Sequence, residues 1–207
     1  MQSIFRTAFI SGATLCVALT GCITPDPTPE AHFFQLQPSS DREPISDDID
    51  IGPLLVGPVE VADYIDKPQI ARRVGEHQIV YDEGNRWAES LEKNVSSVIV
   101  ENLSSFLGKD EVYPFASIHA GEARASVEIR ISRFEGTPGE WAILHAAWTV
   151  SSQNENVGAQ GRRVQLEERV VDSSIKQVVA AQSKLLEEFS RIIAAGVIEI
   201  LSSKDAE

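Results

Sequence analysis

The chain has 207 residues, of which 43% are hydrophobic and 24% are charged, and its formal net charge is −13 at neutral pH. This length and composition are ordinary for one folded domain and argue against an intrinsically disordered chain. The excess of acidic side chains repels phosphate backbones and anionic headgroups, so it argues against nucleic-acid binding and against membrane binding through a basic patch.

The first 21 residues have the pattern of a secretory signal peptide. One basic residue, Arg6, precedes a run of apolar and small residues that is too short and too interrupted for a membrane-spanning helix. The run ends in Leu19-Thr20-Gly21-Cys22, which resembles the lipobox of bacterial lipoproteins. In such proteins the signal is cleaved before the cysteine, and the thiol is alkylated by diacylglycerol. We therefore expect residues 1–21 to be removed and Cys22 to carry lipid.

This lipidation would leave the mature chain without a thiol. Cys16 is lost with the signal and Cys22 becomes a thioether, so thiol catalysis is excluded. The alternative is an ordinary secreted protein in which Cys22 occurs by chance. Lipoproteins retained in the inner membrane often carry Asp after the cysteine, whereas Ile23 follows here. By that resemblance the protein is expected at the outer membrane, lipid-anchored and facing the periplasm.

The rest of the chain divides into a tether and a folded body. Residues 22–31 contain the lipidated cysteine and a proline-rich, semi-rigid tether, and residues 32–207 are expected to form a single α+β periplasmic domain. Short strands are predicted at residues 32–36 and 54–61, the second being rich in branched apolar residues. Pro58 restricts that second strand to a sheet edge or to a bulge.

The pattern changes to a helical period in the next region. After a weak strand candidate at residues 77–81, apolar residues recur at spacings of three and four from Trp87 to Phe106. Asn85 is a reasonable N-cap, and Gly108 follows the last periodic residue. The sequence therefore predicts a helix of about six turns over this stretch.

A short strand at residues 111–114, three longer strands and a final helix complete the predicted body. Residues 125–131 alternate between apolar and polar side chains. A long strand at residues 140–150 has Ala142, Leu144, Ala146, Trp148 and Val150 on one face, and a third strand with Val164 and Leu166 inward follows, which indicates an antiparallel meander. Ser174-x-x-Gln177 then resembles a capping box before an apolar helical stripe. The predicted class is α+β, with a mostly antiparallel sheet and two long amphipathic helices packed on one face.

No motif in the chain points to catalysis or to a bound metal. Zinc-binding, nucleophile-elbow and phosphate-loop patterns are missing, and the four histidines are far apart. Ser117-x-His119 has no identifiable third group to orient a base. The acidic run at residues 47–50 lacks a glycine-turned calcium loop. We therefore expect no catalytic residue, metal or cofactor, and a protein that is not an enzyme.

Two stretches carry a resemblance to a known family. Residues 56–70 contain Gly57-Pro58-Val59 and Tyr64-Ile65-Asp66-Lys67-Pro68-Gln69-Ile70, and Arg86-Trp87-Ala88-Glu89-Ser90-Leu91 follows. Together they resemble the PqiC (YmbA-type) family of ABC-type transport auxiliary lipoproteins. Lys67 stands where arginine is common in the family, and lysine cannot make the bidentate contacts of arginine.

The resemblance implies a function in the cell envelope. Members are outer-membrane-anchored components of systems built around MCE-domain proteins, which are thought to move phospholipid between the two membranes. The implied role is a non-enzymatic docking subunit for the MCE protein, and a homo-oligomer would suit such a role. The alternative is a structural or assembly lipoprotein of the envelope without a transport role. The expected partner interface consists of Tyr64, Asp66, Lys67, Pro68, Gln69 and Ile70, and the competing interpretation of this segment is an ordinary loop at a sheet edge.

Overall fold

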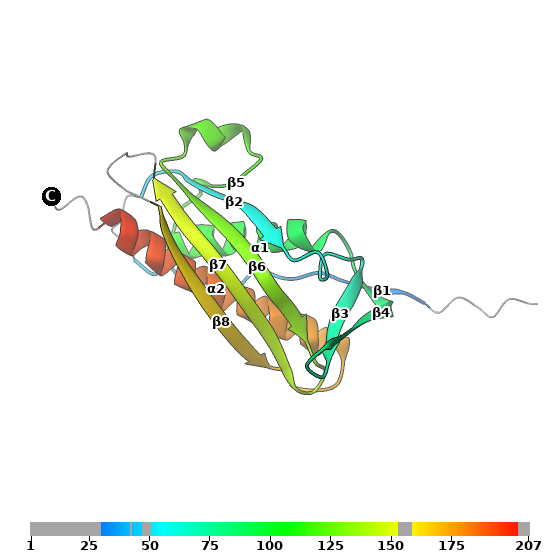
Figure 1. Cartoon of the computed structure of the whole chain (residues 1–207). Coiled ribbons are helices and arrows are strands. Elements are labelled where there is room, and N and C mark those ends of the chain that lie inside the picture. Colours follow the sequence, from blue (N-terminus) through cyan, green and yellow to red (C-terminus); the bar gives the residue numbers. More distant parts are fainter. Residues whose placement is uncertain (1–29, 42, 47–50, 153–158, 203–207) are drawn as a thin grey trace, which may run out of the picture.

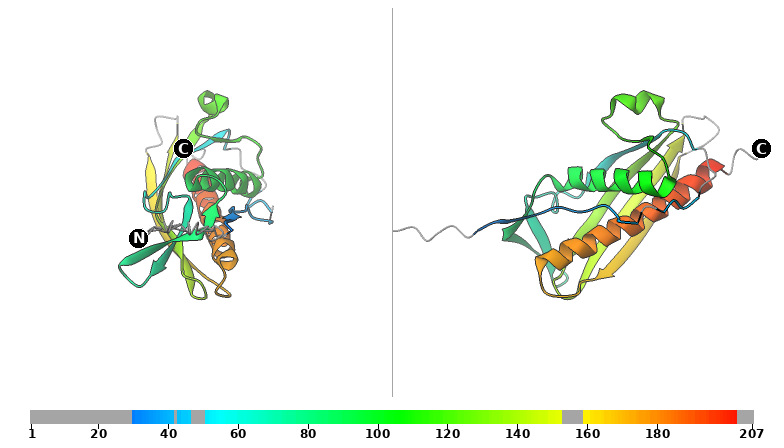
Figure 2. Two further views of the ribbon diagram at one scale, coloured as in Figure 1. Left: turned by 90° about the vertical axis from the view of Figure 1, so that its right-hand side faces the viewer. Right: turned by 180° about the vertical axis from the view of Figure 1, so that it is seen from behind.

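A computed structural model describes residues 30–41, 43–46, 51–152 and 159–202. The predicted signal peptide, Cys22 and the acidic run at residues 47–50 lie outside the described residues. The fold is α+β, as the sequence predicts: an eight-stranded sheet carries two long helices on one face and leaves the other face of its central strands open (Figures 1 and 2).

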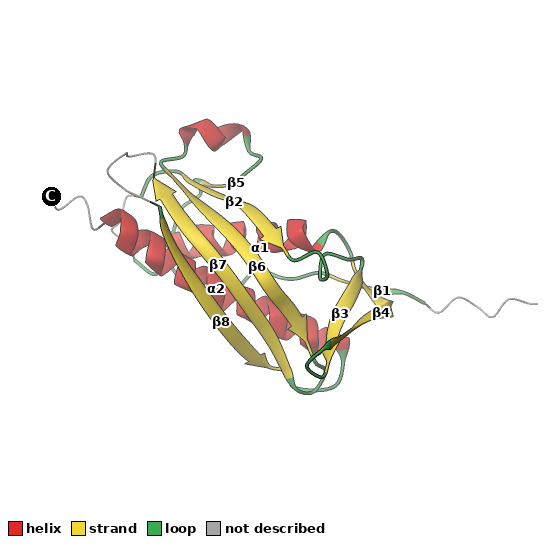
Figure 3. Cartoon of the chain, in the orientation of Figure 1, coloured by secondary structure: helices red, strands yellow, loops and turns green. Residues whose placement is uncertain are grey.

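The order of elements follows the predicted alternation of strands and helices, with one strand and a short helix added (Figure 3). In chain order they are β1 (His32–Phe34), β2 (Leu54–Val61), β3 (Gln69–Val74), β4 (Gln78–Trp87), α1 (Leu91–Leu107), β5 (Val112–Pro114), the 3-10 helix η1 (Ile118–Glu122), β6 (Ala125–Gly136), β7 (Trp141–Ser152), β8 (Gln160–Arg169) and α2 (Ile175–Ser202).

The sheet is mixed, with β6 between its two halves. Strand β6 pairs antiparallel with β7, and β7 with β8, which confirms the predicted meander. On its other side β6 pairs parallel with β2, whose first three residues also pair with β5. Strand β2 is therefore internal where it begins, and the register shift between Val56 and Val59 is the bulge that accommodates Pro58.

The first helix starts later than its periodicity predicts. Helix α1 begins at Leu91, and Trp87 is instead the last residue of β4, which pairs with both β1 and β3. The backbone N–H of Trp87 donates to the carbonyl of Pro68. This backbone group is therefore hydrogen-bonded outside the helix. Trp87 is nevertheless buried, as expected of a core residue. The predicted end is correct: Gly108 adopts a left-handed conformation with φ of 62°.

The core between the sheet and the helices contains two buried asparagines of α1. The side-chain oxygen of Asn94 accepts from the backbone N–H of Leu36 at 2.7 Å, and that of Asn102 accepts from Ser39 at 2.7 Å. The Asn102 amide also donates to Ser190 of α2 at 3.3 Å. These contacts hold the segment that follows β1 against α1, because they satisfy backbone groups that have been removed from water.

Replacing Asn102 with leucine is expected to lower the free energy of unfolding by about 2 kcal/mol, because the buried N–H of Ser39 loses its acceptor. Urea-induced unfolding followed by tryptophan fluorescence would measure this. Ser183→Ala is the matched control, since the Ser183 hydroxyl accepts from the N–H of Gln37 in the same segment but at an exposed position. Equal losses in the two variants would contradict the role assigned to Asn102.

Candidate functional site

The segment between β2 and β3 contains the residues that the sequence singles out as a partner interface. Ile65 and Ile70 are buried at its two ends, at 1% and 0% exposure. Between them, Asp66, Lys67 and Pro68 are exposed. The N–H groups of Ile65 and Asp66 both donate to the carbonyl of Ala62, which closes a tight turn. The buried Ile65 and Ile70 therefore hold a short exposed tip, residues 66–68, which carries two charges and a proline.

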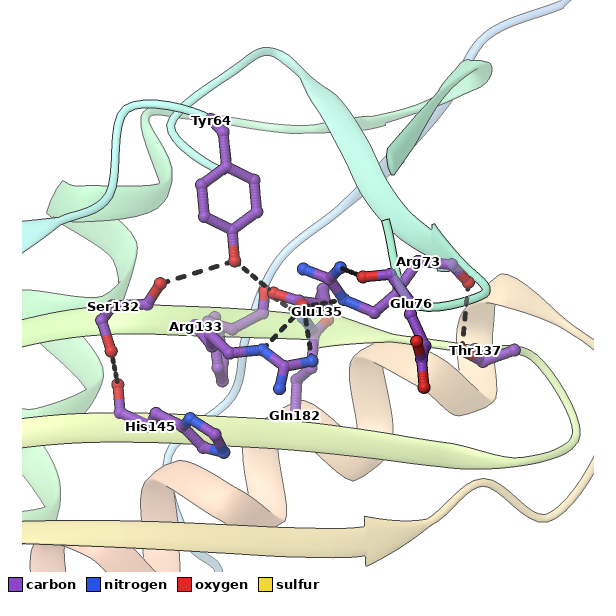
Figure 4. A network of polar contacts seen from close by, with 10 residues as sticks. Tyr64, Arg73, Glu76, Ser132, Arg133, Glu135, Thr137, His145 and Gln182 are labelled. Carbon is purple, nitrogen blue, oxygen red and sulfur yellow. Dashed lines mark hydrogen bonds and ion pairs between the residues drawn. The ribbon is translucent and has the colours of Figure 1, made fainter. Parts of the chain in front are cut away.

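A buried carboxylate on β6 holds this segment against the sheet. The Tyr64 hydroxyl donates to Oε2 of Glu135, and Nε of Arg73 donates to Oε1 at 2.6 Å. Arg133 donates to the same Oε1 through Nη2 at 2.9 Å and Nε at 3.0 Å. The Glu135 side chain is only 1% exposed. Figure 4 shows its carboxylate between the three donors, which come from the β2–β3 segment, β3 and β6.

A bulge in β6 explains why Glu135 lies on the open face. Strand β6 buries Ile131, but its register against β7 shifts between Ile131 and Arg133. After the shift Phe134 points into the core, at 1% exposure, and Glu135 lies opposite Ile143 on the face without helices. Tyr64, Arg73 and Arg133 surround the carboxylate there.

The charge states in this network follow from its geometry. Burial raises the pKa of Tyr64, and its hydrogen bond to the Glu135 carboxylate raises it further. Burial also raises the pKa of Glu135, but hydrogen bonds from Tyr64, Arg73 and Arg133 lower it by more, so the resulting pKa lies below the ordinary value. At neutral pH Tyr64 therefore stays protonated and donates, while Glu135 stays ionised and accepts.

The structure also places the other candidate groups, and it brings Nδ1 of His119 to 3.4 Å from Oε1 of Glu122. The Ser117 hydroxyl accepts from the backbone N–H of His119, and the His119 ring stacks on Tyr113 with centroids 4.8 Å apart. His145 lies on the open face of β7, where partial burial and then the charge of Arg133 lower its pKa.

In the part of the chain that the structure describes, no cluster of His, Cys, Asp and Glu could hold a metal ion. The helices described there are all too short or too polar to cross a membrane.

The family of the chain is decided by sequence. A family model described as the ABC-type transport auxiliary lipoprotein component matches residues 34–194. The chain belongs to this family. The match confirms the resemblance to the PqiC (YmbA-type) proteins, and it implies a membrane-anchored protein of the cell envelope that assists a transport system. No curated protein matches the chain significantly by sequence.

Solved structures show that the fold is shared. An uncharacterized protein of known structure is 19% identical and aligns with a TM-score of 0.67 over 82% of this chain and 99% of its own. Protein XCC0632 from Xanthomonas campestris, a DUF330 protein, is 16% identical and aligns with a TM-score of 0.62 over 84% of this chain and 99% of its own. At 19% and 16% sequence identity, these similarities show that the fold is shared.

Within this family fold, the predicted interface residues have different environments. Asp66, Lys67 and Pro68 are exposed, whereas Tyr64 and Gln69 are partly buried and donate to Glu135 and Glu83. Ile70 is fully buried and belongs to the core, so it is not part of an accessible surface. The accessible part of the predicted interface is therefore the tip at residues 66–68 with the edges of its two flanking polar side chains.

Sequence reasoning missed Glu135 and the strand β3 that supplies Arg73. One signal was present: the apolar residues of β6 are odd-numbered up to Ile131, and the next one is Phe134. Such a change of phase indicates a bulge. Arg86, which begins the second stretch that resembles the family, pairs with Glu83 at 3.2 Å.

Proposed function

We propose that this family member is an outer-membrane-anchored periplasmic subunit of an MCE-type phospholipid transport system, and that it acts without catalysis by docking the MCE protein. The observation that carries the proposal is membership of the family of ABC-type transport auxiliary lipoproteins. The Leu19-Thr20-Gly21-Cys22 sequence supports an acyl anchor at Cys22, and Ile23 after it supports sorting to the outer membrane.

The exposed tip at residues 66–68 supports a docking role. The segment that carries its charged side chains is anchored by core isoleucines and by the Tyr64–Glu135 contact. A surface that is ordered before binding loses less conformational entropy in the complex. A partner can therefore be held by a small contact area.

The proposal is tested by affinity capture of the full-length lipoprotein from detergent-solubilised envelopes, followed by mass spectrometry. We expect an MCE protein to be enriched over a Cys22→Ala variant, which would not be anchored in the same membrane. Recovery of cell-wall or outer-membrane assembly proteins without an MCE protein would overturn the proposal and favour a structural lipoprotein.

Exchanging the charges at the tip, in the double variant Asp66→Lys with Lys67→Glu, is expected to lower capture of the MCE protein about tenfold, because mispaired charges oppose docking. The thermal unfolding midpoint should not change, since both side chains are exposed. The control is the double variant Glu76→Lys with His77→Glu, which also reverses an exposed acidic charge and places a glutamate beside it, at the β3–β4 turn, where the side chains are 90% and 92% exposed. Equal capture by both double variants would remove the tip from the interface.

A further inference from the structure

An arm projects from the sheet between β5 and β6. After β5 pairs with the start of β2, residues 115–122 leave the body and include η1, and the chain returns where the N–H of Arg124 donates to the carbonyl of Pro53 at 2.8 Å. Figures 1 and 2 show this arm standing clear of the sheet, at the end of the molecule opposite β1. We call residues 115–122 the arm.

The arm exposes two large apolar side chains. Ile118 is 94% exposed and Phe115 is 54% exposed. Phe115 is seated over Gly57 of β2, where φ is +122° and an added Cβ would lie 2.8 Å from the Phe115 Cβ. The N–H of Ser117 donates to the carbonyl of Pro114, and that of Ala120 to Ser117. These contacts define the path of the arm and keep Ile118 facing outward.

A hollow of about 420 Å³ lies between the base of the arm and α1. Its apolar wall consists of Pro58, Val59, Pro114 and Phe115, so the arm and the hollow share Phe115. Its opposite wall contains Glu89, Glu92 and Lys93 near the start of α1. The wall therefore has two acidic groups and one basic group, on a chain that already carries a net charge of −13.

We propose that the hollow and Ile118 form a docking site for a segment of a partner protein that carries an apolar side chain beside a lysine or arginine. The inference deepens the proposed function, on which it rests for the identity of the partner. The apolar side chain would occupy the hollow against Val59 and Phe115, and the basic group would face Glu89 and Glu92. Apolar anchors placed in pockets contribute most of the binding energy of protein interfaces.

Two alternative occupants fit the surface less well. A bilayer surface with anionic headgroups is repelled by the two glutamates. The arm also lies at the end opposite β1, which follows the tether to Cys22. A second copy of this acidic chain is less complementary in charge than a basic segment of another protein.

The experiment places a photo-crosslinking benzoylphenylalanine at residue 118 of the full-length lipoprotein in intact cells. The matched control position is Val171, between β8 and α2, which is apolar and 79% exposed but lies at the other end of the sheet. Adducts are mapped to the crosslinked peptide by mass spectrometry. We expect position 118, and not position 171, to yield an adduct to another protein at a segment that combines apolar and basic residues.

A charge variant separates docking from chance proximity. Glu92→Lys, combined with the crosslinker at residue 118, is expected to lower the adduct yield about fivefold, because the basic segment then meets a like charge. Glu128→Lys makes the same charge change on the open face of β6 and should leave the yield unchanged.

Each outcome decides the inference. An adduct to the MCE protein that is sensitive to Glu92→Lys supports both the docking site and the proposed function. An adduct of the same chemistry to a different protein supports the site and overturns the MCE assignment. Adducts only to lipid or to another copy of this chain, no adduct above that of position 171, or a yield insensitive to Glu92→Lys overturns the site. If the site is overturned, the capture experiment with the tip variants still tests the proposed function.

Discussion

Replacing Glu135 with glutamine is expected to lower the free energy of unfolding by about 3 kcal/mol, because it leaves two arginines around a site that no longer carries a negative charge. The carboxylate accepts from Arg73 at 2.6 Å and from Arg133 at 2.9 Å, and its side chain is 1% exposed. The arginine side chains are 25% and 31% exposed, so water can solvate them in part when the carboxylate is lost. The expected loss of stability is therefore at the low end of the range for broken buried ion pairs. Urea-induced unfolding would measure the change.

An ion pair on the same face provides the matched control. Glu60 pairs with Arg130 at 2.8 Å, but these side chains are 55% and 74% exposed. Glu60→Gln is therefore expected to cost at most about 1 kcal/mol, as is usual for surface pairs. The substitution is chemically identical, so the difference between the two variants isolates burial. A loss at Glu135 no larger than that at Glu60 would contradict the role assigned to the buried network.

The pH dependence of stability gives an independent readout of the same carboxylate. The pKa of Glu135 is lower in the folded protein than its ordinary value of 4.5, so the folded state binds this proton less readily than the unfolded state. The stabilisation is therefore present above pH 4.5 and is lost as the pH falls through the folded-state pKa. We expect the stability difference between the wild type and Glu135→Gln to be constant near neutral pH and to narrow below pH 4.5.

The docking tip is joined to the same network through Tyr64. Tyr64 is fixed by Glu135, and the two residues are separated by 71 positions in the sequence. The turn N–H bonds of Ile65 and Asp66 to Ala62 are local, and the buried Ile65 and Ile70 hold the ends, so the tip can keep its place without the tyrosine contact. Weaker partner capture by Glu135→Gln would show that the network positions the interface. Unchanged capture, at a temperature where the variant is folded, would show that the network contributes to stability alone.

Local patterns in the sequence were sufficient to predict much of the sheet and both helices. The pattern of β6 and β7 places the odd-numbered residues from 125 to 131 and the even-numbered residues from 142 to 150 inward, and the structure buries both sets. Ser174 also caps α2 as its pattern indicates, accepting from the N–H of Gln177. These predictions succeed because the determining contacts lie within one element or between neighbours in the chain.

The remaining features depend on contacts between distant parts of the chain. The four-residue spacing from Trp87 to Leu91 continues the helical period of α1. Trp87 is a strand residue because residues 85–87 pair with β1 and its N–H donates to the carbonyl of Pro68. The parallel partners of β2 likewise come from β5 and β6, beyond α1. The tip at residues 66–68 was found through its family resemblance, whereas the carboxylate that holds Tyr64 was not, since no local pattern links Tyr64 to Glu135.

Replacing Gly196 with alanine is expected to lower the free energy of unfolding by about 2 kcal/mol, although alanine is the better helix former by about 1 kcal/mol. Gly196 lies in the interior of α2 and faces Trp148 of β7, which is 1% exposed. An added Cβ would lie 2.2 Å from Cη2 of the indole and 2.9 Å from Cζ2. The ring is rigid and enclosed, so either the helix or the strand must move, and the overlap outweighs the gain in helix propensity. Thermal and urea-induced unfolding would measure the loss.

The neighbouring residue and the indole itself separate the two contributions. Ala195 is exposed on the same helix, so Ala195→Gly is expected to destabilise by about 1 kcal/mol and to show that α2 alone prefers alanine. Trp148→Phe removes the ring atoms that Gly196→Ala would strike, so the double variant should be less destabilised than the sum of the two single variants. A coupling energy of about 1 kcal/mol or more would place the glycine requirement in the contact between α2 and β7. If the stability losses of the two single variants simply add in the double variant, the contact with Trp148 is not the reason that α2 has a glycine at residue 196.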